Sequence, residues 1–241
     1  MIGSLPIVAL TLRSLVDRRR FWLMVLLAAV PVVIAVLVRL FSDEPFSERA
    51  FDQLLVRSVL PLIALVFGTA ALGTELEDGT IVYLLSTPIR RFRIVMDKSL
   101  VAAGLTAGLM VPATLLVGLV ASTQDSSLAG PAIAYAVAVV VGGSAYALAF
   151  LALSAFTSRA LAIGLGYVLL WEAVLAGLLE GSRVFSIRQA TLGLAAQLAG
   201  SGGGTETIAG TTSIIVLGLI IVGSLAIATW RLSRYQLRGG D

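Results

Sequence analysis

Six apolar runs dominate this chain, and short polar segments separate them. Each run is long enough to cross a hydrocarbon core of about 30 Å as a helix that rises about 1.5 Å per residue. The runs lie at Phe21–Phe41, Ser58–Gly73, Leu100–Ala121, Pro131–Ala155, Leu161–Leu179 and Thr212–Trp230. The pattern predicts an all-α, polytopic membrane protein with six transmembrane helices, folded as a single domain over residues 1–241.

The composition supports this prediction and narrows the chemistry. The chain is 58% hydrophobic and 13% charged, with a mean hydropathy of +1.00. A soluble domain of this length cannot bury so much apolar surface. Cysteine and histidine do not occur, and neither does the phosphate-binding pattern Gly-x-x-x-x-Gly-Lys-Ser/Thr. We therefore expect no enzyme activity, no metal site and no cofactor bound by this chain.

The basic residues predict the orientation. If the six runs alternate across the membrane, most of the 17 basic residues fall on one side. They are Arg13, Arg18, Arg19, Arg20, Arg90, Arg91, Arg93, Lys98, Arg159, Arg231, Arg234 and Arg238. The other side has Arg39, Arg49, Arg57, Arg183 and Arg188. Because cytoplasmic loops carry the excess of positive charge, both termini are predicted to be cytoplasmic. Charge spread over short loops does not indicate a nucleic-acid partner.

Residues 1–20 carry a helical apolar stripe before the first span. It consists of Leu5, Val8, Leu12, Leu15 and Val16. The spacing predicts an amphipathic helix on the inner leaflet, with its arginines at the anionic headgroups. The alternative is a plain helical extension of the first span.

Residues 181–210 form the longest segment predicted on the outer side. Ile187, Ala190, Leu194 and Leu198 recur at helical spacing within it. They could form one face of a surface helix or of a partly re-entrant helix. The alternative is a loosely ordered extracytoplasmic cap with no role in transport.

Residues 76–98, between the second and third spans, have the most distinctive internal order. Gly79 can end the preceding helix, and Thr80 or Asp78 can cap a new one. A short apolar face with Leu84 and Leu85 follows, and Pro88 then ends this helix before a basic cluster. The order predicts a short helix on the cytoplasmic surface that offers a docking element to a partner. The alternative is an ordinary loop in which the arginines only set the topology.

This segment resembles a known signature. The pattern Glu75-x-x-x-Gly79-Thr80-x-x-x-Leu84-Leu85-x-Thr87-Pro88-x-x-Arg91, followed by Lys98, is similar to that of ABC transporter permeases of the type 2 exporter family. In that family the segment is a coupling helix that contacts the ATP-binding subunit. The resemblance therefore implies an ATPase-coupling role for Glu75, Gly79, Thr80, Leu84, Leu85, Thr87, Pro88 and Arg91. Asp97 departs from the family, which usually has a small residue before the lysine.

The resemblance also implies partners and a location. Two cytoplasmic ABC ATPase subunits would hold ATP and Mg, and a second permease copy or a related chain would complete the membrane domain. Membrane lipids surround the chain, in a bacterial or archaeal cell membrane. The expected activity is ATP-driven export of an unidentified hydrophobic or amphipathic substrate.

Glu172 is the acidic residue predicted deepest in the hydrocarbon, within the fifth span. Burying a charge there costs about 2.5–3.5 kcal/mol, so the carboxyl should be paired or protonated. It could belong to a substrate path or a conformational latch, with Thr106, Ser144, Tyr146 or Arg57 as partner. Alternatively it makes an ordinary interhelical hydrogen bond worth about 0.6 kcal/mol. An ion-driven secondary carrier centred on Glu172 is the alternative function.

Small residues mark places where helices can approach closely. Gly104 and Gly108 form a Gly-x-x-x-Gly pair in the third span, and Gly142 and Gly143 lie in the fourth. Such residues permit close contact within the bundle or between two copies of the chain.

Overall fold

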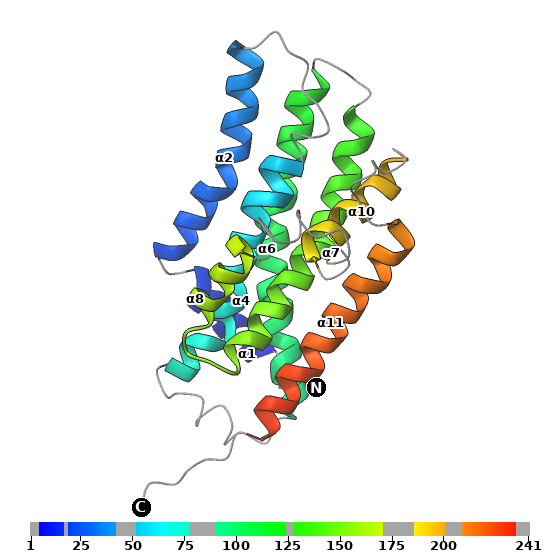
Figure 1. The fold of residues 1–241 in the computed structure, drawn as a ribbon. Helices are drawn as coiled ribbons and strands as arrows, with labels where there is room; N and C mark the ends of the chain where they lie inside the picture. Colours follow the sequence, from blue (N-terminus) through cyan, green and yellow to red (C-terminus); the bar gives the residue numbers. More distant parts are fainter. Residues whose placement is uncertain are drawn as a thin grey trace, which may run out of the picture.

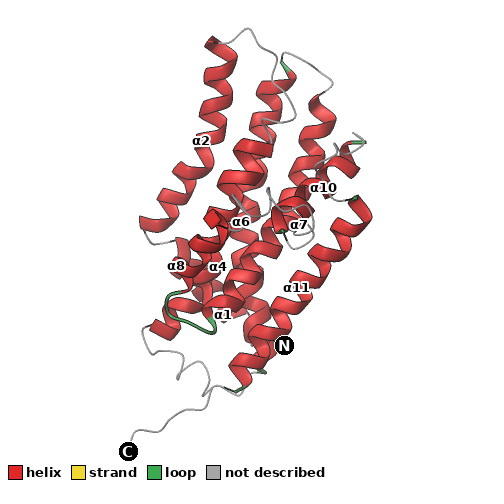
Figure 2. Cartoon of the chain, in the orientation of Figure 1, coloured by secondary structure: helices red, strands yellow, loops and turns green. Residues whose placement is uncertain are grey.

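The computed structural model describes residues 5–16, 19–41, 52–77, 90–123, 128–170, 186–200 and 209–234. All regular elements in these ranges are helical, and no strand occurs among them (Figure 2). The predicted all-α class is therefore confirmed.

Five long apolar helices form the body of the molecule (Figure 1). Shorter helices pack around them. In chain order, the elements are α1 (Leu5–Val16), α2 (Arg19–Phe41), the π-helical segment η1 (Asp52–Val59) that continues into α4 (Leu60–Glu77), α6 (Arg91–Ser122), α7 (Ala129–Ser154), α8 (Ala160–Gly166), α10 (Ile187–Ala199) and α11 (Gly210–Ser233).

The five helices long and apolar enough to cross a membrane match five of the six predicted spans. They are Phe21–Phe41, Asp52–Glu75, Arg91–Ser122, Ala129–Ser154 and Gly210–Ser233. The span predicted at Leu161–Leu179 is described only at its start, as the apolar helix Ala160–Leu170. The rest of that run, including Glu172, lies outside the described residues, so this sixth span stays a prediction.

The third span begins earlier than the sequence predicted. Helix α6 starts at Arg91 instead of Leu100. Its first turns combine exposed charges with Ile94, Val95 and Lys98, which are buried in the bundle. Charged residues lower the average hydropathy of such turns, so the apolar run alone could not reveal them.

The two ends of the bundle can be told apart. At one end, which we call the terminal end, lie α1, the last turn of α4, the first turns of α6 and the end of α11 (Figure 1). At the other, the distal end, lie the ends of α2 and α6 and the start of α7 (Figure 1). The arginine distribution predicts that the terminal end is cytoplasmic.

Helix α7 is the centre of the bundle. It packs against α4, α6, α10 and α11. The rings of Tyr146 and Phe150 stack at 5.9 Å between centroids, and Phe150 makes an edge contact with Tyr167 beyond α8. A Cβ on Gly143 would press on the side chains of Leu60 and Thr106. Small residues on α7 thus allow close packing within the bundle, as the sequence predicted.

Helix α10 enters the bundle from the distal end. A Cβ on Gly210, at the start of α11, would overlap Gln197 near the C-terminus of α10. A Cβ on Gly142, near the middle of α7, would overlap Thr191. Helix α10 therefore runs with its N-terminus innermost, and its residues from Ile187 to Ala195 are buried. Within the segment 181–210, residues Ile187–Ala199 thus form an ordered helix packed into the bundle, and its re-entrant position in the membrane stays a prediction.

Candidate functional site

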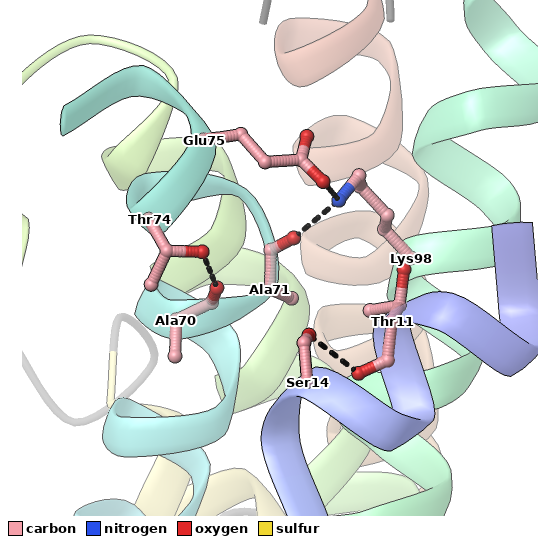
Figure 3. A network of polar contacts seen from close by, with 7 residues as sticks. All are labelled: Thr11, Ser14, Ala70, Ala71, Thr74, Glu75 and Lys98. Carbon is pink, nitrogen blue, oxygen red and sulfur yellow. Dashed lines mark hydrogen bonds and ion pairs between the residues drawn. The ribbon is translucent and has the colours of Figure 1, made fainter. Parts of the chain in front are cut away.

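The ends of α4 and α6 are joined by a buried ion pair (Figure 3). Lys98 Nζ donates hydrogen bonds to Glu75 Oε1 at 2.6 Å and to the backbone carbonyl of Ala71 at 2.7 Å. The Lys98 side chain is 1% exposed and the Glu75 side chain is 29% exposed. The ammonium group is thus withdrawn from solvent and reaches two acceptors on the neighbouring helix.

Local helix geometry explains this arrangement. Ala71 and Glu75 lie one turn apart on α4, so their acceptor oxygens fall on the same face. The last turns of α4 also carry partial negative charge, which favours a nearby cation. A buried ion pair is held at a large desolvation cost, and losing one partner leaves an uncompensated charge. The pair therefore fixes the register of α6 against α4.

Helix α1 covers this region from the terminal end. It packs against both α4 and α6, and Thr11 is buried. Ser14 Oγ donates to the Thr11 carbonyl at 2.9 Å, and Thr74 Oγ1 donates to the Ala70 carbonyl at 3.1 Å (Figure 3). These hydroxyl groups donate hydrogen bonds within their own helices. The polar contact between α4 and α6 in this region is therefore made by Lys98 and Glu75.

Two further cations connect α11 to the same end of the bundle. Arg91 Nη1 donates to the backbone carbonyl of Leu232 at 3.4 Å. The Arg231 guanidinium lies 5.4 Å from the centroid of the Phe156 ring, in the turn between α7 and α8. Together with the Lys98–Glu75 pair, these contacts tie α4, α6, α11 and the α7–α8 turn to one another.

A surface depression of about 510 Å³ lies at the start of α6. It is lined by Arg90, Phe92, Arg93, Met96 and Asp97. Arg90, Phe92, Arg93 and Met96 are exposed, and Asp97 Oδ2 is buried without a donor among the described residues. This depression lies within the predicted coupling segment, residues 76–98, and combines charge with apolar surface, which is typical of docking sites.

The structure places only the two outermost residues of the predicted coupling motif. Glu75 lies in the last turns of α4 and Arg91 opens α6; each contacts a different helix. The other six, which are Gly79, Thr80, Leu84, Leu85, Thr87 and Pro88, lie outside the described residues, as does Glu172. No cluster of three acidic side chains that could hold a metal ion occurs in the described ranges.

Lys98 acquires a role that the sequence did not predict. The arginine and lysine distribution places it among the positive charges predicted on the cytoplasmic side, whereas the structure buries it against Glu75. Both residues belong to the motif, and their pairing could have been suspected from one signal. If the third span begins at Arg91, it contains Lys98, and a lysine inside a span needs a hydrogen-bond acceptor. Glu75, near the end of the preceding span, is such an acceptor.

The comparison with protein families agrees with the motif. The model for the ABC-2 family transporter protein matches residues 16–170. No individual curated protein matches the chain significantly. The matched region includes four of the five long helices, the Lys98–Glu75 pair and the predicted coupling segment. The chain therefore belongs to the ABC-2 transporter family and is a membrane permease of an ABC transporter.

Proposed function

We propose that this permease couples ATP hydrolysis by separate cytoplasmic ATPase subunits to the export of a hydrophobic or amphipathic substrate. Residues 78–89 connect α4 to α6 and form the docking element. The observation that carries the proposal is the Lys98–Glu75 ion pair, which joins the two helices immediately beside this connection.

The pair gives the coupling segment a rigid attachment. A force applied between α4 and α6 at a loosely joined connection would be lost as local bending. With the buried ammonium bound to Glu75 and Ala71, the two helix ends move together. The Arg91 contact to Leu232 extends this attachment to α11. ATP-driven movement of a bound ATPase would then favour one arrangement of the helices over another.

A second permease copy or a related chain is part of the proposal. Gly104 and Gly108 on α6 face open space, since a Cβ on either would meet no atom within 4 Å. Gly108 also lines an apolar groove of about 380 Å³ between α2 and α6. Small residues on an open helix face permit close approach of another helix in the membrane. This supports the third span as a contact between two permease chains related by a two-fold axis.

Co-purification with the ATPase encoded nearest to this chain tests the coupling role. Leu85→Asp should leave the permease in the membrane but remove the bound ATPase and ATP-dependent transport. Leu198→Asp is the matched control, because Leu198 is exposed at the distal end, away from the proposed docking element. That variant should retain the ATPase.

Two results would contradict the proposal. The ATPase could remain bound after residues 79–91 are deleted, which would remove the docking role of this segment. Alternatively, the purified permease could transport substrate without any ATPase, which would support the ion-driven carrier instead.

A further inference from the structure

Arg188 is a buried cation without a counter-charge among the described residues. It lies in the first turn of α10 and is 5% exposed. Its Nε has no acceptor, and its side chain makes no hydrogen bond or ion pair within the described ranges. The neighbouring Gln189 is also buried, and its Oε1 has no donor within those ranges. A guanidinium stays charged in proteins, so its burial demands an anion.

The position of α10 places this charge deep in the molecule. Thr191 lies against Gly142, which is about equally far from the two ends of α7. Arg188 is nearly one helical turn closer to the inner end of α10 than Thr191. Side chains on a helix lean toward its N-terminus, so Arg188 and Gln189 extend further inward. The guanidinium therefore lies near the middle of the bundle.

The helix N-terminus adds to the positive potential there. Helix α10 has 13 residues, and Ser186 Oγ caps it by accepting from the Gln189 backbone N–H at 3.1 Å. The aligned peptide dipoles of such a helix favour an anion at its first turn. In transporters, half-helices that end within the membrane use this property to hold anionic substrate groups.

The elements packed on α10 do not supply the missing anion. Helix α10 contacts α7, α11 and η1. Helix α7 has no charged residue, and the only one in α11 is Arg231, in its last turn at the terminal end. Segment η1 has Asp52 and Arg57, and neither forms an ion pair or hydrogen bond with Arg188. The charged residues of the described elements around α10 thus include Asp52 and Arg57, but none of these elements binds Arg188 through an ion pair.

We infer that the side chains of Arg188 and Gln189, at the start of α10, form a binding site for the anionic group of an amphipathic substrate, a phosphate or a carboxylate. The inference rests on the proposed transport function and narrows its substrate class. The guanidinium would bind the anion through two parallel hydrogen bonds, and the Gln189 carboxamide can turn to add a donor. The site lies outside residues 16–170, so the family match does not assign it.

Ligand binding to the purified full-length permease tests the site. Dodecyl phosphate, dodecanoate and dodecylamine are titrated into the protein in neutral dodecyl maltoside micelles, and the thermal unfolding midpoint is followed. The two anionic probes should raise the midpoint saturably, whereas the cationic probe should not. Arg188→Gln should weaken dodecyl phosphate binding at least about tenfold, because it removes charged hydrogen bonds.

Two variants serve as controls. Arg188→Lys keeps the positive charge and should therefore bind dodecyl phosphate more tightly than Arg188→Gln does. Arg39→Gln removes an exposed arginine at the distal end and should bind as the wild type does. Excess inorganic phosphate distinguishes the possible sources of the anion. If inorganic phosphate competes with dodecyl phosphate, the ligand is a small phosphate compound. If it does not compete, the ligand is an amphiphile or a lipid. Either result supports an anion site.

The unfolding midpoint of the ligand-free protein distinguishes a ligand-binding site at Arg188 from an internal ion pair. Removing an unpaired buried charge should leave the unfolding midpoint of Arg188→Gln equal to or above that of the wild type. Unchanged dodecyl phosphate binding in Arg188→Gln would overturn the inference. So would a large drop in its ligand-free midpoint that Glu172→Gln reproduces, because Glu172 would then be the counter-ion. The assay contains no ATPase, so its failure would leave the coupling role standing.

Discussion

Lys98 and Arg188 are both buried cations, but their surroundings differ. Lys98, near the terminal end, is bound to a carboxylate and a backbone carbonyl of α4. Arg188, at the inner end of α10, has no acceptor among the described residues. Since an unpaired buried charge is costly, the first arrangement is complete among the described residues, whereas the second requires a group beyond them. The difference separates a residue that joins helices from one that we infer binds a ligand.

Glu75→Leu should produce the largest effect on this comparison. It would leave Lys98 buried without a counter-charge, as Arg188 is among the described residues, and should lower the free energy of unfolding by about 3–5 kcal/mol. Lys98→Met should cost less, because the Glu75 side chain is 29% exposed whereas the Lys98 side chain is 1% exposed. Unfolding of the detergent-solubilised single variants and of the double variant Glu75→Leu/Lys98→Met measures the interaction energy between the two side chains. Additive losses would show that the two residues do not act as a pair.

Gly142→Ala should have the next largest effect, and it concerns the position of Arg188. The added Cβ would overlap Thr191 and push α10 away from α7, at a cost of about 1–3 kcal/mol. Gly218→Ala, in α11, is a matched control, because its Cβ would meet no atom within 4 Å. We expect thermal unfolding of that variant to stay close to the wild type. Equal thermal unfolding midpoints for both variants would contradict the close packing of α10 against α7.

Arg91→Gln should have the smallest effect on stability. Its hydrogen bond to Leu232 is long and only partly buried, so the loss should be about 0.5–1.5 kcal/mol. Arg93→Gln is the control, since Arg93 is exposed and its side chain has no hydrogen bond among the described residues. If the terminal end transmits force, Arg91→Gln should reduce transport per ATP hydrolysed more than Arg93→Gln does. If the two variants transport equally per ATP hydrolysed, the coupling role is limited to the Lys98–Glu75 pair.

The long helices were predictable because the membrane imposes a simple rule. Every backbone polar group must be satisfied within a span, so long apolar runs can only be helices. The start of α6 was missed because Arg91, Arg93, Asp97 and Lys98 break the apolar run. Nevertheless, Ile94, Val95 and Lys98 share a buried face there. Hydropathy averages over a helix and cannot tell which of its charges face inward.

The candidate sites show the same limit. The motif identified Glu75 and Lys98 as members of one segment, but their pairing depends on the register between α4 and α6. On α10, the predicted face is buried at Ile187, Ala190 and Leu194, whereas Leu198 is exposed. The burial of Arg188 and Gln189 could not be expected, because polar residues between apolar positions usually face water. The packing of α10 against α7, α11 and η1 contributes to their burial.

The Lys98–Glu75 pair also has a consequence for how tightly the coupling segment can bind. If residues 78–89 dock an ATPase as proposed, the pair lowers the conformational entropy lost on association, because it fixes the separation of the two helix ends that this segment joins. A synthetic peptide that covers only this stretch should therefore bind the ATPase much more weakly than the intact permease, although it offers the same side chains.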